Sequence, residues 1–164
     1  MNNNYINYLI RKYLNKGIVI DTNLFILYLI GIYDRNLISE FKRTRAYSVN
    51  DFYILHKLVL NFREVITTPN VLTEVSNLLE SLNRNKDYKL FQFLHKSLMS
   101  LKEEYIESMK VMETVCFQKF GLTDSTLSFL AENKFLILTD DLPFYHYLET
   151  QKLPAINFNH LRLL

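Results

Sequence analysis

Four acidic residues stand where their carboxylates can act together. Asp21 and Asp141 each follow a short apolar run, and Glu74 and Asp124 each lie in the first turns of a segment with helical spacing. The carboxyl ends of parallel strands meet at one edge of a sheet, and the helices that follow begin there. All four carboxylates can therefore converge, although Asp141 comes about 120 positions after Asp21. Taken alone, each acid has a simpler interpretation as a helix cap or a surface residue.

The chemistry that such a group of acids can carry is metal-dependent. Ionised carboxylates brought close together repel one another unless cations neutralise them. Oxygen ligands without His or Cys favour Mg²⁺ or Mn²⁺ over zinc, and such ions activate water for attack on a phosphodiester. We therefore expect hydrolysis of phosphodiester bonds, with one set of residues both metal-binding and catalytic: Asp21, Glu74, Asp124 and Asp141.

The segments around these acids predict an α/β fold. Four short apolar runs, typical of strands buried on both faces, occur at 17–23, 65–67, 135–138 and 154–158. The segments between these runs have helical spacing. This order predicts a mostly parallel sheet that is covered by helices on both faces.

Capping residues indicate where the helices begin and end. An apolar helix is expected to end at Gly31, and Ser48 is expected to cap the next helix. Thr68 caps a third helix, with Pro69 at its first position. This third helix carries Glu74.

A stretch at about 87–119 is predicted to be a helical region between two strands. Its apolar residues keep a three-four spacing: Phe91, Leu94, Leu98, Leu101, Tyr105 and Met112. We expect two helices that form a hairpin on the protein's own core, and the alternative is a homodimer or partner-binding surface. Gly121 ends the stretch, and Thr123 is expected to cap the next helix, which holds Asp124 in its first turn.

Length and composition fit one domain over residues 1–164, long enough to bury a substantial core. The single cysteine, Cys116, cannot form an internal disulfide and is expected to be buried. The first 16 residues follow helical spacing rather than the pattern of a signal peptide. The longest apolar run is about half of what a bilayer requires. We therefore expect a cytoplasmic protein without a membrane span.

The charge of the chain bears on its partners. Nineteen basic and 17 acidic residues give a formal net charge of +2, which becomes +6 if a metal centre neutralises four acids. Lys42, Arg43 and Arg45 lie between Phe41 and Tyr47. Arginine beside aromatic rings can bind single-stranded nucleic acid, so these three basic residues are candidate RNA contacts. The alternative is a solvated loop or helix face.

Four motifs resemble those of a known family. They are Val19-Ile20-Asp21-Thr22-Asn23, Thr68-Pro69-Asn70-Val71-Leu72-Thr73-Glu74-Val75, Gly121-Leu122-Thr123-Asp124-Ser125 and Leu138-Thr139-Asp140-Asp141. In order and spacing they resemble the four acidic motifs of the PIN-domain ribonucleases, which include the toxins of VapBC toxin-antitoxin pairs. The resemblance covers nearly the whole chain, which departs from a compact toxin at 34–61 and 87–119.

The resemblance implies a fold, a cofactor and an activity. The fold would be a three-layer α/β/α sandwich, the cofactor Mg²⁺ or Mn²⁺, and the activity endonucleolytic cleavage of RNA by metal-activated water. An antitoxin-like protein partner is implied as well. Asp141 matches the fourth acid, and its neighbour Asp140 is the alternative. Asn23 and Thr139 match polar positions that orient the metal-binding acids.

Two alternatives to a nuclease remain. One is a catalytically inactive PIN-like module that binds RNA or a protein partner through the helices predicted at 87–119. The other is a phosphatase, because the motif at Asp21 also resembles the first motif of the haloacid-dehalogenase family. That family has a second Asp where this chain has Asn23, which disfavours the phosphatase.

Overall fold

A parallel sheet forms the centre of the computed structural model, which describes residues 3–82 and 89–162. The strands within this part of the chain are β1 (Ile18–Ile20), β2 (Val65–Thr67), β3 (Lys102–Glu103), β4 (Leu136–Thr139) and β5 (Ala155–Asn157). Their order in the sheet is β3-β2-β1-β4-β5, and each neighbouring pair is parallel. The strand that ends at Asp21 is therefore the central one.

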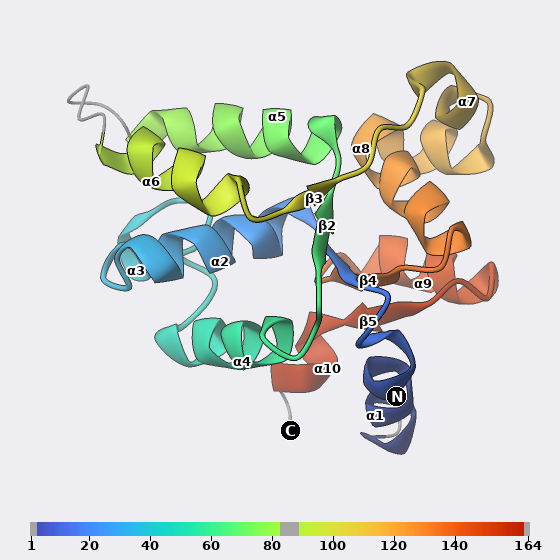
Figure 1. Cartoon of the computed structure of the whole chain (residues 1–164), viewed down its shortest axis with the longest axis horizontal. Helices are drawn as coiled ribbons and strands as arrows, with labels where there is room; N and C mark the ends of the chain where they lie inside the picture. The colour runs from blue at the N-terminus through green and yellow to red at the C-terminus, as the bar shows by residue number, and fades with distance from the viewer. Residues whose placement is uncertain (1–2, 83–88, 163–164) are drawn as a thin grey trace.

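Helices cover both faces of this sheet. They are α1 (Asn3–Tyr13), α2 (Thr22–Tyr33), α3 (Leu37–Glu40), α4 (Val49–Val59), α5 (Pro69–Leu79), α6 (Lys89–Leu98), α7 (Ser108–Met112), α8 (Val115–Glu132), α9 (Leu142–Thr150) and α10 (Phe158–Arg162), with a 3-10 turn, η1 (Glu80–Leu82). Figure 1 shows α2, α4 and α6 on one side of the sheet, and α1, α8 and α9 on the other. The predicted three-layer α/β/α sandwich is confirmed.

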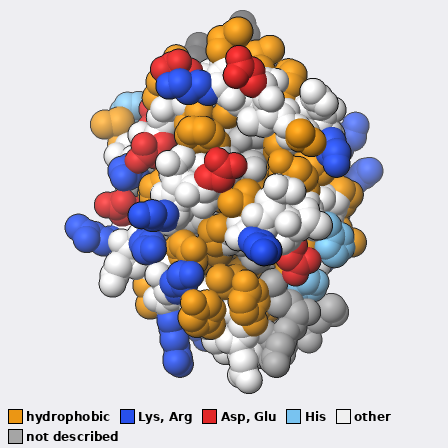
Figure 2. All heavy atoms as spheres, turned by 90° about the vertical axis from the view of Figure 1, so that its right-hand side faces the viewer, with side chains coloured by type: hydrophobic (Ala, Val, Ile, Leu, Met, Phe, Trp, Pro, Cys, Tyr) orange, Lys and Arg blue, Asp and Glu red, His pale blue; other side chains and the backbone are white. Residues whose placement is uncertain are grey.

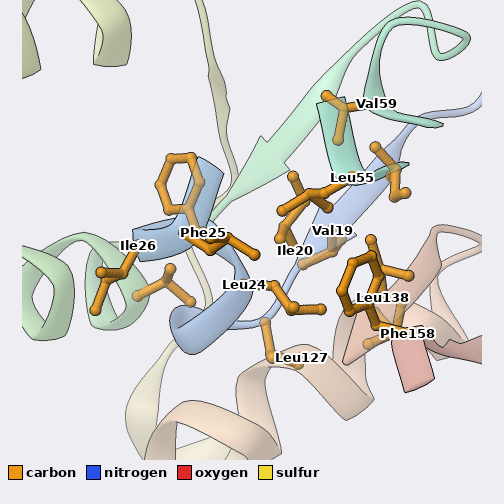
Figure 3. Packing of buried hydrophobic residues seen from close by; sticks show 14 of the residues in the cluster. Val19, Ile20, Leu24, Phe25, Ile26, Leu55, Val59, Leu127, Leu138 and Phe158 are labelled. Carbon is orange, nitrogen blue, oxygen red and sulfur yellow. The ribbon is translucent and has the colours of Figure 1, made fainter. Parts of the chain in front are cut away.

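Burial explains why β1 can be so short. Its three residues are almost completely buried, and they pair with β2 on one side and β4 on the other. Figure 3 shows the hydrophobic cluster to which Val19 and Ile20 belong, with Leu24 of α2, Leu55 of α4 and Leu127 of α8. The apolar side chains from both layers therefore hold the strand that carries Asp21.

Most of the predicted boundaries agree with the structure. The Ser48 side chain accepts a hydrogen bond from the Asp51 backbone N–H, and the two residues form a capping box at the start of α4. The Thr68 side chain accepts from the Val71 N–H at 3.3 Å, which caps α5 as predicted. The helix expected to end at Gly31 continues to Tyr33, because Gly31 packs against a neighbouring helix instead of terminating its own.

The helical hairpin predicted at about 87–119 is wrong. Residues 87 and 88 lie outside the described part of the chain. After α6 the chain forms the short edge strand β3, and then the single-turn helix α7. The apolar spacing does not continue, since 79% of Tyr105 and 42% of Met112 is exposed. The charged residues Lys102 and Glu103 join the sheet through backbone bonds, which need no apolar side chain.

Gly121 breaks the helix that precedes Asp124, as predicted. Its φ of 82° is non-helical, and it divides α8 into two segments. The second segment begins directly after Gly121, so Thr123 lies within its first turn instead of capping it. Asp124 lies in the same first turn.

Two expectations from composition concern burial and membranes. Cys116 is a buried free cysteine, as expected. None of the helices within residues 3–82 and 89–162 combines the length and apolar content that crossing a membrane requires.

Replacing Gly31 by Ala should destabilise the fold, because a Cβ there would lie 2.1 Å from a ring carbon of buried Phe52. We expect Gly31→Ala to lower the free energy of unfolding by about 1–3 kcal/mol in urea denaturation. Phe52→Leu makes room at the same contact. The double variant should therefore lose less stability than the sum of the two single losses. Additive losses would contradict this close contact.

Candidate functional site

The four predicted acids line one small pocket. Its volume is about 220 Å³, and Asp21, Glu74, Asp124 and Asp141 all contribute to its wall. The remaining lining residues are Thr22, Asn23, Phe120, Leu122 and Thr123. Asp21 follows β1, Glu74 lies on α5, Asp124 lies on α8 after the break, and Asp141 caps α9. The topology therefore brings together acids from four separate elements.

Asp21 is the most deeply placed of the four, with 6% of its surface exposed. The buried hydroxyl of Thr139, in β4, donates a hydrogen bond of 2.6 Å to Asp21 Oδ2. The same hydroxyl oxygen accepts from the Asp141 backbone N–H at 3.0 Å. Thr139 therefore fixes the two acids that follow adjacent strands.

The charge of Asp21 is unfavourable in this setting. Burial is the largest cause that raises the pKa of its carboxyl to about 7, and the charges of Asp140 and Asp141 raise the pKa too. The hydrogen bond from Thr139 acts in the opposite direction, because it stabilises the ionised form. In the absence of a cation, Asp21 is therefore partly protonated near neutral pH.

The Glu74 carboxylate accepts a hydrogen bond from a residue that was not among the site residues predicted from the sequence. The buried Thr22 hydroxyl donates a hydrogen bond of 2.9 Å to Glu74 Oε2. Thr22 directly follows Asp21, at the first position of α2. The signal that would have indicated this role is a hydroxyl next to a site acid at the start of a helix.

Asp124 faces the other three acids. Burial is the largest cause that raises the pKa of its carboxyl to about 8. The charges of Asp21, Asp141 and Glu74 follow in that order, and each raises the pKa further. The carboxyl of Asp124 therefore lies close enough to the other three acids for their charges to disfavour its ionisation.

The structure distinguishes the two neighbouring acids after β4. Asp141 lines the pocket, and its Oδ1 accepts a hydrogen bond of 2.8 Å from the Phe144 N–H at the start of α9. Asp140 does not line the pocket, and its carboxylate accepts a hydrogen bond from the Tyr47 hydroxyl. Asp141 is therefore the member of this pair that belongs to the acidic pocket.

The remaining predicted site residues differ in their position relative to the acidic pocket. Asn23 lines the pocket, but its side chain is exposed. Lys42, Arg43 and Arg45 are exposed on the turns between α3 and α4, and none of them lines the acidic pocket. The structure does not bring these basic residues together with the carboxylates.

The ligand atoms that the pocket offers are of the type that binds a hard divalent cation. Carboxylate oxygens are the ligands that Mg²⁺ and Mn²⁺ prefer. As the side chains stand, no group of three acidic, His or Cys residues in the described part of the chain is arranged to hold one ion. Carboxylates on rotatable side chains can approach a cation more closely than they approach one another.

Comparison with known proteins adds no assignment. No protein-family model matches the chain, and no curated protein sequence matches it. The interpretation of the pocket therefore rests on its own residues.

Asp124→Asn should stabilise the metal-free protein at alkaline pH, because Asn carries no charge among the remaining carboxylates. With a pKa of about 8 when folded and 3.8 as the ordinary value, the cost of ionising Asp124 is complete above pH 8 and absent below about pH 4. In urea denaturation with EDTA, we expect a gain of roughly 1–3 kcal/mol near pH 8.5 that declines as the pH falls.

The matched control for this experiment is Glu132→Gln, which removes an exposed carboxylate from the same helix. It should change stability little at either pH. A pH-independent effect of Asp124→Asn would show that this carboxyl is not destabilised by its neighbours.

Proposed function

We propose that this protein is a metal-dependent endoribonuclease of PIN type, which hydrolyses RNA phosphodiester bonds at the acidic pocket. The observation that carries the proposal is the convergence of Asp21, Glu74, Asp124 and Asp141 on one pocket, where the pKa of Asp124 responds to the other three. Buried carboxyls with strongly raised pKa values, such as Asp21 and Asp124, cluster at functional sites.

The four acids would hold Mg²⁺ or Mn²⁺ through their carboxylate oxygens. When bound, such an ion lowers the pKa of a bound water and stabilises charge on the phosphate oxygens. In hydrolysis the water oxygen forms a bond to phosphorus, the bond from phosphorus to the leaving oxygen breaks, and that oxygen takes up a proton.

The protein contributes position and charge to this reaction. Thr139 orients the carboxylate of Asp21, and Thr22 orients that of Glu74. Because Asp21 and Asp124 have raised pKa values, cation binding near neutral pH should displace protons from both carboxyls. Metal affinity should therefore increase with pH up to about 8.

The proposal includes a cytoplasmic location and a second protein as partner, either an antitoxin-like chain or another copy of this one. Exposed apolar side chains on and next to α7 support a partner surface, since 69% of Met109 and 58% of Val115 is open to solvent. Figure 2 looks onto the side of the molecule where α7, α8 and α9 lie, and shows hydrophobic side chains among charged ones. The same surface would serve an inactive PIN-like module that binds a partner or RNA.

Loss of the acids should remove metal binding and RNA cleavage together. We expect isothermal titration of Mn²⁺ to give binding to the wild type, and none to a variant with Asp21→Asn and Asp124→Asn. Cleavage of labelled single-stranded RNA should fall about a hundredfold or more in that variant, because the ligands that position the ion are gone.

Asp34→Asn is the matched control, since Asp34 is an exposed acid on the loop after α2. It should bind Mn²⁺ and cut RNA as the wild type does. Absence of both activities in the wild type would reject the nuclease and favour the inactive binding module.

Thr139→Val should weaken the metal site without unfolding the protein, because valine keeps the shape of the buried side chain and removes the hydroxyl that bonds Asp21 and Asp141. We expect Mn²⁺ affinity to fall about 10- to 100-fold in titration calorimetry. Thr139→Ser, which keeps the hydroxyl, should stay close to the wild type. Equal losses in both variants would indicate a packing effect instead.

A further inference from the structure

A second pocket lies beside the acidic one, along α5. Its volume is about 390 Å³, and it shares Glu74 and Thr123 with the acidic pocket. The other lining residues are Pro69, Asn70, Thr73, Asn77, Tyr105, Ile106 and Ser108. We call this pocket the α5 groove. The two pockets therefore adjoin at Glu74 and Thr123.

The edge strand β3 places Tyr105 at this groove. The Glu104 N–H donates a hydrogen bond of 2.9 Å to the Thr67 carbonyl oxygen, which extends the pairing of β3 with β2. On the other side of Tyr105, Ile106 is buried in the core. Anchored neighbours thus hold Tyr105 at the rim of the groove, although 79% of its own surface is exposed.

The face of α5 supplies polar groups to the same groove. Asn70, Glu74 and Asn77 are spaced at i, i+4 and i+7, so they lie along one side of the helix. Each Asn amide offers both donors and an acceptor. Among the described residues that line the groove, Glu74 is the only charged one. The groove therefore suits an uncharged polar ring better than a phosphate.

We propose that the α5 groove binds one base of a single-stranded RNA, next to the phosphate that lies at the acidic pocket. The Tyr105 ring stacks on the base, and the amides of Asn70 and Asn77 bond to its polar edge. The inference rests on the proposed function for the position of the phosphate. It adds the part of the substrate that the carboxylates do not contact.

The test compares RNA that has bases with RNA that lacks them. Fluorescence anisotropy measures binding of a labelled single-stranded RNA and of an abasic ribose-phosphate chain of the same length. Ca²⁺ is present as an ion that also takes oxygen ligands. The proteins are the wild type, Tyr105→Ala, Tyr105→Phe and, as a matched control, Met99→Ala. Met99 is nearly as exposed as Tyr105, 75% against 79%, and lines neither pocket.

Stacking sets the expected result. Tyr105→Ala should weaken binding of base-containing RNA about tenfold and leave binding of the abasic chain unchanged. Tyr105→Phe should behave like the wild type because it keeps the ring. Met99→Ala should stay within about twofold of the wild type for both ligands. In cleavage assays with Mn²⁺, kcat/KM should follow the same order.

Three outcomes of these measurements separate the base site from the nuclease. Equal binding of base-containing RNA by the wild type and Tyr105→Ala overturns the inference, even if the acids prove essential for cleavage. Base-dependent binding that requires Tyr105, without any cleavage, supports the base site and rejects the nuclease alone. Failure of the wild type to bind either ligand overturns both proposals.

Discussion

Burial of acidic side chains among like charges, at one edge of a small parallel sheet, is the constraint on which the rest of the structure depends. The raised pKa values of Asp21 and Asp124 show that the fold holds these groups where ionisation is unfavourable. A domain is stable by only about 5–15 kcal/mol, so this cost must be offset elsewhere. The offset comes from the almost fully buried strand β1 and from α2, which is apolar along most of its length.

Threonine hydroxyls connect the acids across the elements that carry them. Thr139 in β4 bonds Asp21 after β1, and Thr22 in α2 bonds Glu74 in α5. Each bond thus joins one motif to the carboxylate of another, so that the motifs do not orient their acids independently. A hydrogen bond also favours the ionised form, which opposes part of the repulsion. These bonds orient the carboxylates, and no basic side chain is among the described residues of the pocket wall.

The sequence predicted those parts of the structure that depend on buried apolar runs and capping residues. β1 and β4 are continuous apolar runs, and Thr68 is followed by proline, so the positions of Asp21, Glu74 and Asp141 could be predicted. β3 could not, because Lys102 and Glu103 join the edge of the sheet through backbone bonds alone. The three-four spacing of apolar residues before β3 extends in the sequence to Tyr105 and Met112. That spacing favoured a helix, although both residues are exposed in the structure.

The edge strand nevertheless connects the proposed chemistry to the proposed base site. Thr67 accepts the backbone bond that positions the residue before Tyr105. The next residue, Thr68, caps the helix that carries Glu74. One two-residue segment therefore anchors both the ring at the rim of the groove and the acid that the groove shares with the acidic pocket. A shift in the pairing of β3 with β2 would move the Tyr105 ring relative to the acids, so the register of one short strand sets the distance between the two proposed sites.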